Sequence, residues 1–116
     1  MDQSRQIVVV EDVFVRSFLR TALERMGHRV ICATPVEAVR VLRTGEIDLL
    51  VTNCPASFAE FGAAIPLVYV AAFPDPAAAE SFTRWLPLRK PFQTVELRGA
   101  VDRLLSQETS APPAGG

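Results

Sequence analysis

Polar side chains follow three apolar runs of this sequence, and their types are those of a cation or phosphoryl-transfer site. Glu11 and Asp12 come directly after the first run, Asn53 after the second, and Lys90 after the third. Carboxylate oxygens bind Mg²⁺, and a carboxylate can attack phosphorus when a divalent ion neutralises the incoming group. Asn53 departs from this set, because its amide nitrogen is not nucleophilic and its oxygen is a neutral, weaker ligand.

The amide also changes the charge of the set. Two carboxylates and one ammonium group give a formal charge of −1, where an aspartate at position 53 would give −2. We therefore expect weak or absent Mg²⁺ binding at Asp12 and Asn53. An ordinary interpretation stays open for both residues, since Asp12 can cap a helix and Asn53 can end a strand in a turn.

Strand-like apolar runs alternate with stretches of helical period, which predicts an α/β fold with helices on both faces of a parallel sheet. The predicted strands are Ile7–Val10, Arg29–Cys32, Leu49–Thr52, Leu67–Ala71 and Leu86–Arg89. The predicted helices run from a cap at Asp12 to Met26, and over Pro35–Arg43, Pro76–Trp85 and Thr94–Leu105. In a doubly wound sheet the carboxyl ends of the central strands form the binding crevice, so we expect Asp12, Asn53, Ala71 and Lys90 to converge there.

The crossover between the third and fourth predicted strands is short. Only the 12 residues from Cys54 to Ile65 separate Asn53 from Pro66. This length allows at most a turn or two of helix. The face of the sheet beneath is expected to be thinly covered, which makes it one candidate place for a partner.

Size and charge limit the function classes. A chain of 116 residues that is 49% apolar has the size of one domain, which we place at 1–105, and its net charge of −1 gives no general attraction to nucleic acid or to membranes. No apolar run reaches the roughly 20 residues of a membrane span, so we expect a cytoplasmic protein. Residues 106–116 lack periodicity and are expected to form a disordered tail with no output domain attached.

Over Gln6 to Leu105 the order of these motifs resembles the receiver domain of two-component response regulators. The resemblance rests on Glu11-Asp12, Asn53, Ile65-Pro66 and Lys90-Pro91-Phe92. It implies a flavodoxin-like sheet with strand order 2-1-3-4-5, here with a shortened or missing third helix. It also implies that position 53 is the phosphoacceptor position and that the Lys90–Pro91 peptide bond is cis.

Several positions depart from the family's pattern. Ala71 stands where the family has a hydroxyl that binds the phosphoryl oxygen, and a methyl group cannot donate that hydrogen bond. Pro87 stands where a switching aromatic side chain is usual. Together with Asn53 and the short crossover, these departures predict a degenerate receiver (a pseudo-receiver). Our hypothesis is that Lys90 pairs with Asp12 or Glu11, which replaces the metal and fixes one conformation.

The resulting prediction is a stand-alone, non-enzymatic, cofactor-free module that acts in signal transduction by phosphorylation-independent protein binding. The partner would be a histidine kinase or another signalling protein. The family's docking and dimer face maps to Pro76–Leu105, where the candidate interaction residues are Arg84, Trp85, Arg89, Arg98 and Arg103. Such residues are equally common on an ordinary solvated face.

Two alternatives stay open. The vestigial acidic crevice could serve as a small-ligand or metal sensor. The chain could also be an unconventional phosphoacceptor that uses another carboxylate. Asp48 does not suit that role, because it lies five residues before Asn53 at about 3.3 Å per residue, at the opposite end of the strand.

Overall fold

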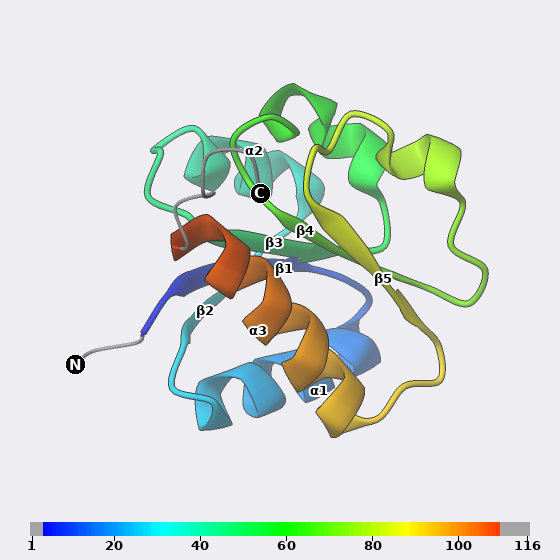
Figure 1. Cartoon of the computed structure of the whole chain (residues 1–116). Helices are drawn as coiled ribbons and strands as arrows, with labels where there is room; N and C mark the ends of the chain where they lie inside the picture. Colours follow the sequence, from blue (N-terminus) through cyan, green and yellow to red (C-terminus); the bar gives the residue numbers. More distant parts are fainter. Residues whose placement is uncertain (1–3, 110–116) are drawn as a thin grey trace.

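Five parallel strands form the centre of the computed structural model, which describes residues 4–109 (Figure 1). The strand order is β2-β1-β3-β4-β5, as the resemblance implied. The strands are β1 (Gln6–Val10), β2 (Arg29–Cys32), β3 (Leu49–Thr52), β4 (Leu67–Ala71) and β5 (Trp85–Arg89). Their bounds agree with the predicted runs to within one residue at each end.

The register of β1 and β3 places the polar residues side by side. Val10 pairs with Thr52 at the carboxyl ends of the two strands. Both strands run in the same direction, so Glu11 directly follows β1 and Asn53 directly follows β3 at the same edge of the sheet. Three successive residues, Val8 to Val10, are almost fully buried, as expected for a central parallel strand covered on both faces.

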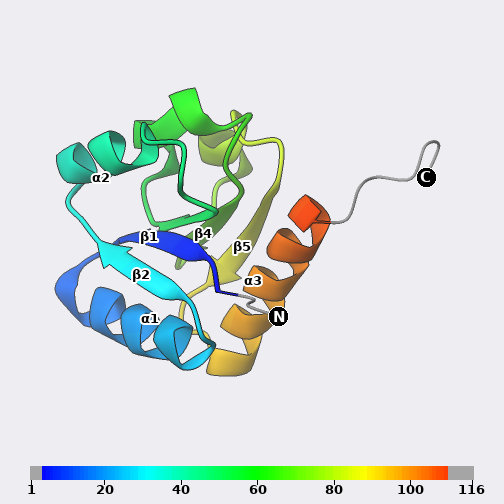
Figure 2. The same cartoon turned by 90° about the vertical axis from the view of Figure 1, so that its left-hand side faces the viewer.

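Two helical layers cover the sheet. On one face lie the helices α1 (Val13–Arg25) and α3 (Thr94–Thr109), and on the other lie α2 (Pro35–Leu42) and the short 3-10 segments η1 (Pro55–Phe61) and η2 (Pro76–Ala79). Figure 2 shows α2 and α1 on opposite sides of the sheet.

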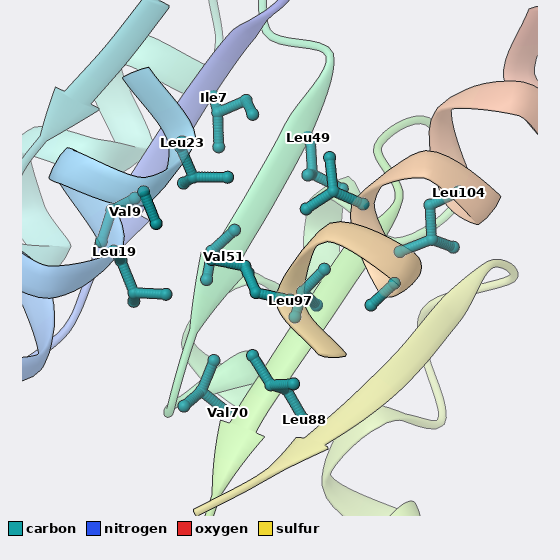
Figure 3. Close-up of a cluster of buried hydrophobic side chains, with 14 of the residues drawn as sticks. Ile7, Val9, Leu19, Leu23, Leu49, Val51, Val70, Leu88, Leu97 and Leu104 are labelled. Carbon is teal, nitrogen blue, oxygen red and sulfur yellow. The ribbon is translucent and has the colours of Figure 1, made fainter. Parts of the chain in front are cut away.

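Leucines from α1 and α3 form the core on their face of the sheet. Leu19 and Leu23 of α1 and Leu97 of α3 point toward the strands, as Figure 3 shows. Each is fully buried, and each contributes about 1.5–3 kcal/mol by leaving water. This core packs α1 and α3 against the same face of the sheet.

The crossover after β3 is short, as predicted, but its face of the sheet is not thinly covered. Phe58 interrupts η1 with φ −124° and ψ 25°, so the segment does not form a regular helix. The same residue is fully buried, and Phe61, Ile65 and Phe82 pack with it. The expectation of a thin cover is therefore wrong, because aromatic side chains fill the space of the missing helix.

The prediction of a helix over Pro76–Trp85 is also wrong. Only η2 forms, with Asp75 Oδ1 accepting a hydrogen bond from the Ala77 amide at 3.0 Å. Beyond it, the Thr83 amide donates to the carbonyl of Gly62 at 3.1 Å, and the Arg84 carbonyl accepts from Leu67. These contacts with neighbouring segments take the backbone groups that a longer helix would have used.

The helix ends follow local sequence signals. Asp12 caps α1, Thr34 and Glu37 form a capping box on α2, and Gly27 and Gly45 take positive φ values of 96° and 78° after the two helices. Helix α3 continues to Thr109, beyond the boundary expected at Leu105, because adding a turn to a formed helix needs no apolar contact.

The rest of the expected tail, 110–116, lies outside the described residues. Within the described part of the chain, no helix is both long and apolar enough to cross a membrane.

Candidate functional site

The carboxyl edge of the sheet brings the predicted site residues to one place. Glu11 and Asp12 follow β1, Asn53 follows β3, and Lys90 follows β5. The Lys90 amide donates to the carbonyl of Ala71 at the end of β4, with an N–O distance of 2.9 Å. The structure thus places the ends of four parallel strands, with the predicted site residues after them, at this edge of the sheet.

Glu11 is the most buried charged residue of this edge. Its side chain is fully inaccessible, and its Oε1 accepts a hydrogen bond from the Asp12 amide at 2.9 Å. Its Oε2 lies 3.1 Å from Lys90 Nζ, which is its one partner among the described residues. A carboxylate so placed depends on this ammonium group, since an unpaired charge in the interior is strongly unfavourable.

Lys90 therefore pairs with Glu11, one of the two partners predicted for it. The lysine side chain is 28% exposed, so its ammonium group lies at the boundary between the core and the solvent. The Lys90–Pro91 peptide bond is cis, as the resemblance implied.

The Asp12 side chain caps helix α1. Its Oδ1 accepts hydrogen bonds from the amides of Phe14 and Val15, both at 3.1 Å. The hydrogen bond from Val15 is the main cause that holds the pKa of the Asp12 carboxyl below its usual range; desolvation opposes it, and the Phe14 amide, the Lys90 charge and Glu11 add smaller lowering effects. The ordinary interpretation of Asp12 as a helix cap is thus confirmed.

Asn53 is exposed at the turn after β3, and a buried threonine shapes that turn. Thr52 Oγ1 accepts a hydrogen bond from the Cys54 amide at 3.1 Å and lies 3.3 Å from Cys54 Sγ. Thr52 was not among the predicted site residues. The feature of the sequence that could have indicated Thr52 is its hydroxyl group at the end of the otherwise apolar run Leu49–Thr52.

The donor set at this edge is a poor fit for a divalent cation of the Mg²⁺ type. The Glu11 carboxylate is neutralised by Lys90, Asp12 is engaged by the helix amides, and Asn53 offers a neutral oxygen. Among residues 4–109, no three His, Cys, Asp or Glu side chains gather closely enough to hold a metal ion.

Ala71 and the residues after it add no hydroxyl to the edge. Ala71 is half-buried, and the carbonyl of Ala72 accepts a hydrogen bond from Arg89 Nε at 3.1 Å. The Arg89 guanidinium lies over the ring of Phe73, 5.5 Å from its centre, in a cation–π contact. Arg89 is therefore held at the end of the sheet.

The five residues predicted to share an interaction face are divided by the sheet. Trp85 is partly buried and packs against the core on the α2 side, with its ring centre 6.0 Å from that of Tyr69. Its neighbours Leu86 and Leu88 face the opposite core, under α3. Trp85 and the arginines of α3 thus lie on opposite sides of the edge strand β5.

The two arginines of α3 also point to different neighbours. Arg98 lines a hollow with Phe18 and Arg25 of α1. Arg103 lines another hollow with Leu86 and Pro87 of β5. Arg84 is half-buried directly before β5.

Exposed apolar side chains gather around the same carboxyl edge, which the sequence analysis did not predict. The large exposed ones among the described residues are Val13, Phe14, Phe18, Val36, Phe73 and Val95. Val13, Phe14, Val36 and Val95 lie in the first two residues of a helix that follows a strand, and Phe73 lies two residues after β4. Phe18 lies one turn further along α1. Phe14 and Phe18, four residues apart on one helix, are the sequence feature that could have predicted this exposed apolar surface.

No family model matches the chain, and no curated protein matches it in sequence. Solved structures match in fold. The signal receiver domain of an HD domain-containing protein from Pseudomonas fluorescens is 19% identical, with a TM-score of 0.76 over 91% of this chain and 90% of that one. A two-component response regulator from Clostridium difficile is 19% identical, with a TM-score of 0.77 over 91% and 99%.

The receiver domain of a sensor histidine kinase from Pseudomonas aeruginosa, which has a magnesium ion coordinated in its active-site cleft, is 21% identical. Its TM-score is 0.71, over 89% of this chain and 98% of that one. At these identities the similarity is one of architecture. The chain has the fold of response-regulator receiver domains.

Proposed function

We propose that this chain is a signalling module with a receiver fold that binds a partner protein and does not accept a phosphoryl group. The observation that carries the proposal is the Glu11–Lys90 ion pair at 3.1 Å beside an amide at position 53. In the receiver pattern a lysine at this place contacts the acceptor or its phosphoryl group. Here its ammonium group already neutralises a buried carboxylate.

The chemistry of the other positions supports the same proposal. Asn53 has no nucleophilic oxygen, and Ala71 has no hydroxyl to receive a phosphoryl oxygen. Without a donor set suited to Mg²⁺, the negative charge of an incoming phosphoryl group would meet Asp12 without a neutralising ion. We therefore infer that the module is not an enzyme and needs no cofactor.

A permanent ion pair also favours one conformation. Lys90 reaches from the end of β5 to the end of β1, and loss of either partner of a buried pair costs about 3–5 kcal/mol. A module held in this way would present the same surface at all times. We propose a cytoplasmic signalling protein, such as a histidine kinase, as the partner, because the similar structures are receiver domains and response regulators.

Phosphorylation can be tested directly. The purified chain is incubated with acetyl phosphate and Mg²⁺, and its intact mass is measured beside that of a receiver domain with an acceptor aspartate. We expect the mass of this chain to stay unchanged while the control gains one phosphoryl group. A stable phosphoryl adduct on this chain would overturn the proposal.

A further inference from the structure

A hollow of ≈ 360 Å³ lies at the amino edge of the sheet, at the opposite end of the strands from Asn53 and Lys90. Two of its lining residues directly precede strands, because Arg5 comes before β1 and His28 before β2. Met26 from the end of α1 and Arg98, Asp102 and Leu105 from α3 also line it. We call this cavity the amino-edge hollow.

Charged side chains of both signs line the amino-edge hollow without pairing with each other. Arg98 and Asp102 lie four residues apart on α3, the spacing at which opposite charges commonly pair on a helix. Within residues 4–109, neither side chain forms an ion pair or a hydrogen bond. Both are exposed, so each can meet a group of opposite charge on a ligand.

His28 adds a neutral hydrogen-bond donor to the hollow. Its Nδ1 accepts a hydrogen bond from the Arg5 amide at 3.3 Å, so the proton of the neutral imidazole is on Nε2. No group in the described part of the chain accepts a hydrogen bond from this Nε2. The ring is half-buried and held by Nδ1, which leaves the Nε2–H group to a ligand.

The size, charge and apolar wall of the hollow limit what fits. Known ligand pockets measure about 300–1,000 Å³, so this one suits a small molecule. Its two arginines and one aspartate give a formal charge of +1 while His28 is neutral. Met26 is half-buried and Leu105 is buried, and both supply apolar surface.

We propose that the amino-edge hollow binds a free α-amino acid with an apolar side chain. The carboxylate of the ligand would lie at Arg98 and the His28 Nε2–H group, its ammonium group at Asp102, and its side chain against Met26 and Leu105. Guanidinium groups bind carboxylates through two parallel hydrogen bonds. A simple anion would leave Asp102 facing a like charge, whereas a zwitterion gives both charges of α3 a partner.

The helix ends at the hollow favour the same ligand. Met26 is the residue that ends α1, and the carbonyl end of a helix attracts positive charge. An ammonium group there is stabilised, and a ligand with only negative charge is not. The site lies away from the acidic crevice, where the sequence suggested a small-ligand site, and it does not depend on the proposed partner binding.

The test begins with binding to the purified, tag-free full-length chain. Isothermal titration calorimetry is carried out with alanine, valine, leucine, isoleucine, methionine and phenylalanine as free amino acids. We expect at least one of them to bind with a Kd below about 1 mM. Its amide, which lacks the carboxylate, and its N-acetyl derivative, which lacks the ammonium group, are each expected to bind about tenfold more weakly or worse.

Nuclear magnetic resonance locates the bound ligand. His28 is the only histidine of the chain, so the Cε1–H signal of its imidazole reports on the amino-edge hollow alone. We expect this signal to shift as the amino acid is added and to saturate at the Kd found by calorimetry.

Substitutions on α3 test the two charges separately. Arg98→Gln and Asp102→Asn are each expected to raise the Kd about tenfold or more. Arg103→Gln is the matched control, because it removes an exposed arginine of the same helix outside the hollow, and its Kd should equal that of the natural chain. Thermal unfolding followed by circular dichroism verifies that the variants are folded, which the exposure of the three side chains favours.

Four outcomes overturn the proposal. They are no binding of any of these amino acids, equal binding of the amide or the N-acetyl derivative, a Kd that Arg98→Gln and Asp102→Asn leave unchanged, and binding without a shift of the His28 signal. None of these results bears on phosphorylation, which the mass experiment tests separately.

Discussion

Lys90 Nζ lies 3.1 Å from Glu11 Oε2, although β3 and β4 separate the strands that carry the two residues. The lysine side chain thus spans the ends of two intervening strands, and Asn53 follows one of them. In the receiver pattern, the corresponding lysine contacts the acceptor or its phosphoryl group. Here the Lys90 ammonium group is paired with the buried Glu11 carboxylate.

Removing the ammonium group tests how much the ion pair stabilises the fold. Lys90→Met is expected to lower the free energy of unfolding by about 3 kcal/mol, because the buried Glu11 carboxylate loses its partner. The double variant Lys90→Met, Glu11→Gln should recover part of this loss, since it removes the buried charge as well. Urea unfolding at pH 7 measures both, and a loss below about 1 kcal/mol in the single variant would show that solvent screens the pair.

A carboxylate at position 53 should create affinity for Mg²⁺. Asn53→Asp places a second acidic residue beside Asp12 and offers Lys90 an alternative partner. We expect Mg²⁺ to raise the Tm of this variant and to leave the natural chain and Asn53→Gln unchanged, because ligands that bind only the native state stabilise it. An equal Mg²⁺ effect on all three proteins would contradict the role given to the amide.

The close approach of two loops at Gly62 predicts a destabilising substitution. A Cβ at this position would clash with the backbone carbonyl of Ser81, and the nearby Thr83 amide donates to the Gly62 carbonyl at 3.1 Å. Gly62→Ala should therefore cost about 1–3 kcal/mol in urea unfolding.

Gly99 is the matched control for this substitution. It lies exposed within α3, with no atom within 4 Å of an added Cβ. Gly99→Ala is expected to stabilise the chain by about 0.5–1 kcal/mol, because alanine favours the helix. If the two alanine variants had the same stability, packing of the loops at Gly62 would not be the cause.

Much of the fold could be predicted because its signals are local. The run Ile7–Val10 is β-branched and apolar at every position, which fits only a strand covered on both faces. The failed helix over Pro76–Trp85 had favourable alanines, but its backbone groups bond to Gly62 and Leu67, which are distant in sequence. On α1 the structure buries Leu19 and leaves its neighbour Phe18 exposed, a choice that depends on packing against the sheet.

The sequence predicted where the site lies, but it did not predict which carboxylate pairs with Lys90. Parallel strands bring their carboxyl ends to one edge, so the meeting of Glu11, Asp12 and Lys90 followed from the fold class. Which carboxylate binds Lys90 depends on the helix that begins after Asp12. Its free amides engage Asp12 at the surface, and Glu11 is left facing the interior, which no spacing rule specifies.

His28 predicts a dependence of stability on pH. Its Nδ1 accepts a hydrogen bond from the Arg5 amide at 3.3 Å, so the neutral imidazole fits the fold. Burial is the main cause that lowers the pKa of His28 below its ordinary value of 6.5; the charge of Asp102 opposes the effect, Arg5 adds to it, and Asp48 opposes it weakly.

Below pH 6.5 the unfolded chain therefore binds a proton at His28 more readily than the folded chain does. The stability that the neutral imidazole contributes is complete above this pH and is lost as the pH falls through the lowered pKa of the folded state. His28→Gln keeps a polar side chain without a proton equilibrium, so its free energy of unfolding should fall less between pH 7.5 and pH 5. Urea unfolding at several pH values measures the difference, and parallel curves for the two proteins would show that His28 does not titrate differently in the folded state.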